Sequence, residues 1–206
     1  MNESDAKPPG LREFKRQQTR QRILEVGLES FLAKGYEATT LDEIAAAAGI
    51  SRRTFFYYFK SKDDILLGYL QVYAQAIKSS VTEMQPEQPP LTTAKAALLK
   101  LIAGFQEAKM MATARLMQQS EALRSRRNVG YLQFEQAVYE GLCALYPERD
   151  GDGLKLVAMI SISGLRLAVD NWLRKDGKPP LAACLQNAFG TLEAELSAPS
   201  LRPDHP

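Results

Sequence analysis

Apolar residues recur at every third or fourth position along most of this chain. In the first helical segment, for example, Ile23, Leu28 and Phe31 fall on one face, as in an amphipathic helix. No stretch of useful length alternates apolar and polar residues as a strand would. The pattern predicts an all-α fold of about nine helices. They span Glu13–Lys34, Leu41–Ala48, Arg52–Phe59, Lys62–Met84, Thr92–Glu107, Met111–Arg126, Tyr131–Leu145, Leu154–Leu173 and Leu181–Leu196.

Short stop signals separate these helices. Gly35 follows the first helix, since glycine accepts the left-handed backbone that ends a helix. Thr40 followed by Glu43 fits a capping box, and Ser51 stands at the N-cap of the third helix. The proline-rich segment 85–90 is the clearest break. We therefore expect four parts: a first unit over 1–62, a connecting segment over 63–90, a second helical domain over 91–196 and a mobile tail over 197–206.

The charge of the chain is uneven. Its 206 residues hold 26 Lys and Arg against 24 Asp and Glu, a net charge of +2 that is mild for a nucleic-acid binder. Residues 1–62, however, hold 11 basic and 8 acidic residues, whereas residues 63–206 carry a net charge of −1. The basic residues gather in two groups, within 12–22 and within 52–62. Clustered positive charge is typical of a polyanion binder, although solvated helix faces carry the same pattern.

The composition offers little for catalysis or metal binding. The one histidine, His205, lies next to the C-terminus, and Cys143 and Cys184 stand isolated inside helical segments. We therefore expect two packed free thiols, no cofactor, no metal and no enzymatic activity. The polar start of the chain is unlike a signal peptide, and no apolar run reaches the ~20 residues of a membrane span. We expect a cytoplasmic protein without a membrane partner.

The segment 41–59 has the features of a helix-turn-helix. Gly49-Ile50-Ser51 joins two short helices, and small alanines before the turn let the helices approach closely. In such a unit the second helix enters the DNA major groove, where its first residues reach base edges and later ones reach phosphates. The candidate contact residues in that order are Arg52, Arg53, Thr54, Tyr57, Tyr58 and Lys62. A helical hairpin that packs only against protein is the alternative, with one of the two tyrosines in an aromatic mini-core.

Residues 19–66 resemble the DNA-binding domain of the TetR family of bacterial transcriptional regulators. The matching positions are Thr19, Ile23, Phe31, Gly35-Tyr36, Thr39-Thr40, Ile44-Ala45, Ala48-Gly49-Ile50-Ser51, Thr54-Phe55, Tyr58-Phe59, Ser61-Lys62 and Ile65-Leu66. The resemblance covers about a quarter of the chain. It implies that residues 1–62 are a basic arm and DNA-binding domain, and that residues 91–196 are a ligand-binding and dimerisation domain.

The resemblance also implies particular DNA contacts. Thr39 or Thr40 would bind a phosphate at the start of the second helix, as would Tyr57, Tyr58 and Lys62 further along the chain. Two positions depart from the family pattern. Phe56 stands where members often have tyrosine, which removes a hydroxyl that could bind a phosphate. Arg53 stands where they often have a small residue, and it would add either a base contact or a phosphate contact.

The helix predicted over 154–173 is apolar on nearly every face. A helix of this kind is buried all round, and a chain of this size achieves that most simply by sharing the helix with a second copy. We therefore expect a homodimer through residues 154–173 and 181–196, which the family resemblance also implies; an ordinary core helix is the alternative. Two-fold symmetry would place the recognition helices about 34–36 Å apart, on a near-palindromic operator.

The second domain also offers candidates for an effector pocket, each of which could instead be an ordinary core residue. They are Phe105, Met111, Arg115, Met117, Tyr131, Phe134, Arg166 and Trp172. For Arg166 we favour an ion pair with Asp170, four residues on; an anionic group of the ligand is the alternative. The stretch from Arg115-Leu116 to Leu123-Arg124-Ser125-Arg126, together with Trp172 after an arginine-bearing helix, is similar to a branch of the family that includes mycofactocin-associated regulators. This resemblance of the C-terminal half implies an acyl-CoA ligand and ranks an apolar or acyl-type effector first.

The combined prediction is a DNA-binding transcriptional regulator, specifically a repressor that its effector releases from double-stranded DNA. Two alternatives stay open. One is an activator on the same fold, and the other is a small-molecule carrier or adaptor that does not bind DNA.

Overall fold

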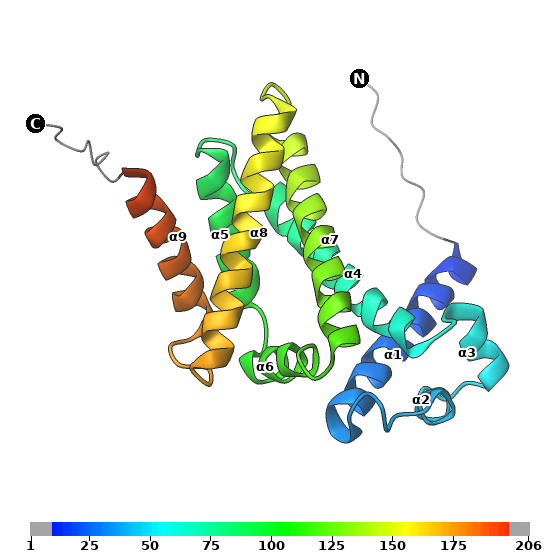
Figure 1. Cartoon of the computed structure of the whole chain (residues 1–206). Helices are drawn as coiled ribbons and strands as arrows, with labels where there is room; N and C mark the ends of the chain where they lie inside the picture. The colour runs from blue at the N-terminus through cyan, green and yellow to red at the C-terminus, as the bar shows by residue number, and fades with distance from the viewer. Residues whose placement is uncertain (1–9, 198–206) are drawn as a thin grey trace, which may run out of the picture. The chain divides into compact units, whose positions relative to one another are not determined.

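The computed structural model describes residues 10–197. Over these residues the chain forms nine α-helices and no strand, so the predicted all-α fold is confirmed (Figure 1). The helices are α1 (Leu11–Lys34), α2 (Leu41–Ala47), α3 (Arg52–Tyr58), α4 (Lys62–Thr82), α5 (Pro90–Ala103), α6 (Glu107–Leu116), α7 (Glu121–Leu145), α8 (Gly151–Arg174) and α9 (Leu181–Ser197). His205 and the expected tail, apart from Ser197, lie outside the described residues.

The boundaries of the middle helices differ from the prediction. The prediction of a single helix over 111–126 is wrong, because α6 ends at Leu116 and α7 begins at Glu121. Ser120 makes the break: its side chain accepts a hydrogen bond from the Leu123 amide at 3.2 Å, which caps the start of α7. The apolar spacing runs on through this cap, so periodicity alone could not reveal it.

The chain divides into two compact units after Leu70, inside α4. The first unit holds α1, α2, α3 and the beginning of α4. The second holds the rest of α4 and the five helices that follow.

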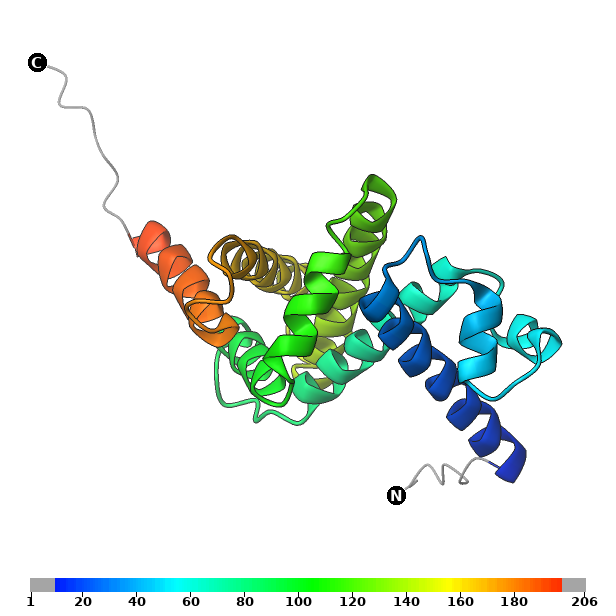
Figure 2. The ribbon, with the colours of Figure 1, turned by 90° about the horizontal axis from the view of Figure 1, so that it is seen from below.

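In the first unit, α2 and α3 pack with the long helix α1 (Figure 2). The core contains Leu28 and Phe31 of α1, Ile44 of α2 and Phe55 of α3, all of them buried. Each such side chain contributes about 1.5–3 kcal/mol to stability when it leaves water. Gly27 lets α1 lie close to the Ile65 side chain at the beginning of α4, because a Cβ on residue 27 would lie 2.8 Å from Cγ2 of Ile65.

In the second unit, α8 lies beside both α7 and α9 (Figure 1 and Figure 2). Its inward face buries Ala158, Ile162 and Trp172. Cys143 is half-buried and Cys184 is buried, both as free thiols, as the sequence predicts. Among the described helices, none combines the length and apolarity that a bilayer crossing requires.

Candidate functional site

Helix α3 separates its side chains into an inner and an outer face. Phe55 is fully buried, and Phe59 just after the helix is buried as well. On the outer face Arg52 and Arg53 are exposed, and Tyr57 leaves 71% of its surface open to solvent. The helix start is capped by Ser51, whose hydroxyl accepts a hydrogen bond from the Thr54 amide at 3.1 Å. A rigid, capped helix therefore presents two arginines and a phenol outward.

The two arginines have different surroundings. Arg52 Nη1 donates a hydrogen bond to Oδ2 of Asp42 on α2 at 2.6 Å, and its guanidinium lies 5.6 Å from the centre of the Phe56 ring. Arg53 forms no ion pair with any described residue. Phe56, which departs from the family pattern, thus supports one face of Arg52 with its ring.

Thr39 and Thr40, either of which the family resemblance offers as a phosphate contact, have different surroundings. The Thr39 side chain is buried, and its hydroxyl donates to the carbonyl oxygens of Gly35 at 2.8 Å and Ser30 at 3.2 Å. This argues against a phosphate contact from Thr39 and leaves Thr40 as the exposed member of the pair. Thr39 is buried because the chain turns at Gly35, and the Thr39 hydroxyl bonds backbone carbonyls at the end of α1 and in that turn.

Thr40 and Glu43 form the predicted capping box at the start of α2. The Thr40 hydroxyl accepts from the Glu43 amide at 3.2 Å, and the Glu43 carboxylate accepts from the Thr40 amide at 2.9 Å. Lys34 Nζ donates to the same carboxylate at 2.7 Å. The hydrogen bond from Lys34, followed by those from Thr40, lowers the pKa of Glu43 to about 2.

Lys62, at the start of α4, is engaged within the first unit. Its ammonium donates to the carbonyl oxygens of Tyr36 at 2.8 Å and Glu37 at 3.3 Å, and it lies 4.7 Å from the centre of the Tyr36 ring. Tyr58 is half-buried, with its ring 5.1 Å from that of Tyr57 in a T-shaped arrangement. Tyr57 is therefore the more exposed of the two tyrosines. Lys62 connects the start of α4 to the turn after α1 through its hydrogen bonds.

Residues 23–69 match the family model "Bacterial regulatory proteins, tetR family". The whole chain is similar to TcmR, an HTH-type transcriptional regulator of Streptomyces glaucescens, at 27% identity over 95% of this chain and 92% of that protein. Residues 23–69 are therefore a DNA-binding domain of the TetR type. The similarity to TcmR extends across the C-terminal half, which the family model does not cover.

Two further comparisons concern that half of the chain. MftR of Mycobacterium tuberculosis, by name a regulator of mycofactocin biosynthesis, is 26% identical over 88% of this chain and 93% of its own length. A solved structure of Thermus thermophilus FadR, a TetR-family transcriptional repressor in complex with lauroyl-CoA, has a TM-score of 0.60 at 22% identity. That alignment covers 90% of this chain and all of the FadR chain. The fold is thus shared along nearly the whole length.

One face of α8 is apolar and open. Leu156, Met159 and Leu167 expose 56%, 46% and 48% of their surface. A groove of about 530 Å³ follows this face of α8 and continues over α9 beside Phe189. In a single copy α8 is therefore buried on one side only. Of the residues that the sequence assigned to a dimer interface, those on the other side of α8 face solvent, while the rest belong to the core of the second unit.

The predicted effector residues fall into separate groups. Trp172 is buried, and its indole Nε1 donates to no described residue. A Cβ on Gly177 would lie 3.2 Å from Met111 Cε and 3.8 Å from that indole nitrogen, so these residues adjoin. Arg115 is exposed and pairs with Asp176.

The other candidates lie elsewhere in the second unit. The rings of Phe105 and Tyr73 lie 4.9 Å apart, and Met117 is buried just after α6.

Tyr131 is the centre of another group. The Phe134 ring lies 6.0 Å away in a T-shaped arrangement, and the guanidinium groups of Arg127 and Arg166 lie 6.0 Å and 5.7 Å from the Tyr131 ring centre. Burial raises the pKa of Tyr131 to about 12, against the opposing effect of the nearby Arg127 charge. Tyr131 is therefore a buried, un-ionised phenol with two guanidinium groups near its ring.

The predicted ion pair between Arg166 and Asp170 is wrong. Arg166 is exposed and lies over Tyr131, while Asp170 Oδ1 accepts a hydrogen bond from Arg127 Nη1 at 3.3 Å. Arg127 reaches Asp170 from α7 because α7 and α8 pack side by side. The sequence interpretation missed Arg127, although it stands in a visible run of basic residues, since its partner is distant along the chain.

Proposed function

We propose that this TetR-family regulator is a repressor that binds a near-palindromic operator as a homodimer and leaves it when an effector binds within residues 71–197. The observation that carries the proposal is α3, a capped helix that holds Arg52, Arg53 and Tyr57 on its exposed face. Arginines at the start of a recognition helix can read guanine in the major groove, and a phenol further along can bind a phosphate. A repressor of this kind works in the cytoplasm, where its DNA lies.

The open apolar face of α8 supports the dimer. Large exposed side chains such as Leu156, Met159 and Leu167 on one helix face are typical of a buried interface rather than of free surface. Pairing of α8 and α9 with their copies would cover these side chains. A two-fold axis then sets the two copies of α3 about 34–36 Å apart, one turn of DNA.

The second unit supports a small-molecule effector. Its buried polar atoms without a partner among the described residues include the Trp172 Nε1 donor, and such atoms are rare unless water or a ligand satisfies them. The FadR of similar fold binds lauroyl-CoA, which favours an apolar or acyl-type effector in this chain as well. The effector can act only by binding the two conformations with different affinity.

Fluorescence anisotropy with the DNA upstream of the protein's own gene tests this function. We expect specific binding that exceeds binding to a scrambled duplex by about a thousandfold or more, and that weakens steeply with salt. Arg53→Ala should reduce the specific binding, whereas the exposed loop substitution Glu148→Gln should not. Equal affinity for both duplexes would contradict the proposal and favour a carrier or adaptor. Enhanced transcription from the bound promoter would instead identify an activator.

A further inference from the structure

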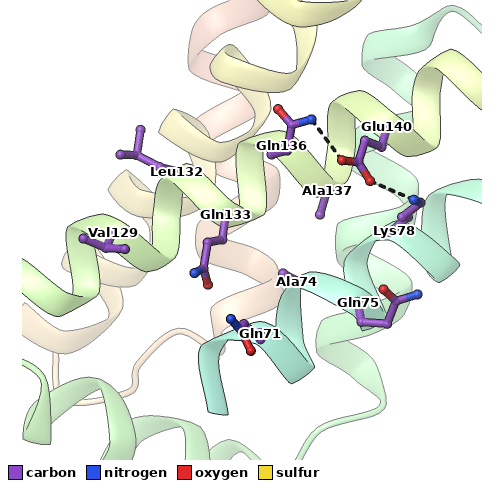
Figure 3. A pocket seen from close by; sticks show the side chains of 10 residues that line it. All are labelled: Gln71, Ala74, Gln75, Lys78, Val129, Leu132, Gln133, Gln136, Ala137 and Glu140. Carbon is purple, nitrogen blue, oxygen red and sulfur yellow. Dashed lines mark hydrogen bonds and ion pairs between the residues drawn. The ribbon is translucent and has the colours of Figure 1, made fainter. Parts of the chain in front are cut away.

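A groove of about 490 Å³ lies between α4 and α7 in the second unit (Figure 3). Ligand sites commonly have volumes of about 300–1,000 Å³. Gln71, Ala74, Gln75 and Lys78 of α4 form one side, and residues of α7 between Val129 and Glu140 form the other. None of these residues is among the effector candidates that the sequence singled out.

The charges in the groove cancel. Lys78 Nζ donates to Glu140 Oε2 at 2.7 Å at one end of the groove, and Gln136 Nε2 donates to the other oxygen of that carboxylate at 2.9 Å (Figure 3). The hydrogen bond from Lys78 holds the pKa of Glu140 below its ordinary value. With the ammonium and the carboxylate committed to each other, the groove favours a ligand without net charge.

The groove also exposes apolar surface. Val129 and Leu132 are exposed on the α7 side, with 64% of Leu132 open to solvent. Ala74 and Ala137 line the space between the two helices (Figure 3). An apolar body laid along the groove would remove the exposed side chains of Val129 and Leu132 from water.

Gln133 supplies the specific polar group. Its side chain extends from α7 toward α4, on the side of Gln71 (Figure 3). Its Oε1 atom is buried and accepts no hydrogen bond from the described residues. An unpaired buried oxygen is costly, and a ligand that donates to it removes that cost. A carboxamide also carries N–H donors beside its oxygen, so its best complement presents a donor and an acceptor side by side.

We propose that the groove between α4 and α7 is a binding site for a neutral molecule with a primary carboxamide or lactam, which pairs with Gln133 and lays an apolar body against Val129 and Leu132. Because Lys78 is paired with Glu140, the lining offers an anionic ligand no unpaired cation. The amide of Gln133 sets the orientation of the bound molecule. This site stands independently of DNA binding, because its test needs only the protein and the small molecule.

Titration of the isotope-labelled full chain with benzamide, followed by NMR, tests the site. We expect benzamide to shift the Gln133 side-chain amide and the methyl groups of Val129 and Leu132. Toluene, which has the ring without the amide, should shift only the methyl groups. Shifts confined to residues outside α4 and α7, or no binding of benzamide, would overturn the proposal.

Two substitutions of Gln133 isolate the amide. Gln133→Met keeps the length of the side chain without its hydrogen-bonding groups, and Gln133→Leu does the same with a different shape should the first variant fail to fold. Each should weaken benzamide about tenfold, as expected for the loss of one or two hydrogen bonds, and leave toluene binding no weaker. Gln186→Met, a matched change on the exposed side of α9, should bind benzamide as the native chain does. Equal benzamide affinity in the native chain and both Gln133 variants would refute the pairing.

Discussion

Arg52 of α3 is held by Asp42 of α2, with Nη1 and Oδ2 2.6 Å apart. Both side chains are exposed, and in the proposed function they belong to the surface that meets DNA. Exposed pairs of this kind are worth about 0–1 kcal/mol. Because the pair is this weak, Asp42 can have one of two roles. It can hold Arg52 away from DNA, or it can orient the guanidinium toward a base.

Asp42→Asn distinguishes these two roles. If the carboxylate restrains Arg52, its loss frees a cation and removes a negative charge near the phosphates. We then expect up to about fivefold tighter binding to both operator and scrambled DNA, measured by fluorescence anisotropy. Glu148→Gln removes an equal charge elsewhere and serves as the control. Weaker operator binding with unchanged scrambled binding would show instead that Asp42 aims Arg52.

Arg53→Ala should weaken operator binding, because Arg53 is exposed and has no ion-pair partner among the described residues. A lost base contact costs about 1–3 kcal/mol at the operator and leaves scrambled DNA nearly unaffected. A lost phosphate contact weakens both and lowers the salt slope by about one. Salt titration on the two duplexes separates these outcomes. No change on either duplex would exclude Arg53 from the DNA interface.

Lys62→Ala should destabilise the first unit, since the ammonium ties α4 to the carbonyl oxygens of Tyr36 and Glu37. We expect a loss of about 1–2 kcal/mol in the free energy of unfolding, measured by urea denaturation. Lys60→Ala, an exposed lysine two residues earlier, is the matched control. If stability is unchanged while the salt slope of DNA binding falls by about one, the lysine is a phosphate contact and not a tether.

Glu43 makes the stability of the first unit sensitive to acid. Its folded pKa is about 2 against an ordinary value of 4.5, because Lys34 and Thr40 donate hydrogen bonds to the carboxylate. A folded pKa below the unfolded one means that the carboxylate stabilises the fold above about pH 4.5 and loses this effect as the pH falls toward 2. Glu43→Gln should flatten that part of the stability curve, measured by thermal unfolding between pH 7 and pH 2.5. If the melting temperature of the Glu43→Gln protein falls with pH as that of the native chain does, Glu43 does not have this role.

Leu167→Arg should disrupt the proposed dimer, because an arginine on the open face of α8 would bury an unpaired charge in the interface. Sedimentation equilibrium should show a monomer with a native far-ultraviolet circular dichroism spectrum. Val72→Arg introduces the same charge at an exposed apolar position on α4 and should leave the dimer intact. A dimeric Leu167→Arg protein would place the interface elsewhere.

Local signals explain how much of the fold the sequence predicts. Helix periodicity, the Thr40–Glu43 capping box and the Ser51 cap involve residues within a few positions of each other, and all of them appear in the structure. The break at Ser120 was missed because a lone serine is a weak signal inside an apolar repeat. The exposure of Arg52 and Arg53 follows from their place on a short helix whose opposite face carries Phe55.

The helical fold, the helix-turn-helix and the resemblance to the TetR family can all be predicted from the sequence, because each depends on spacing along the chain. Which polar groups have partners becomes visible once the helices are packed. Asp42 holds Arg52 from ten residues away, Asp170 holds Arg127 rather than Arg166 from 43 residues away, and Gln133 is left with a buried oxygen that has no partner among the described residues. These partners could not be predicted, because packing brings together residues whose separation in sequence carries no signal.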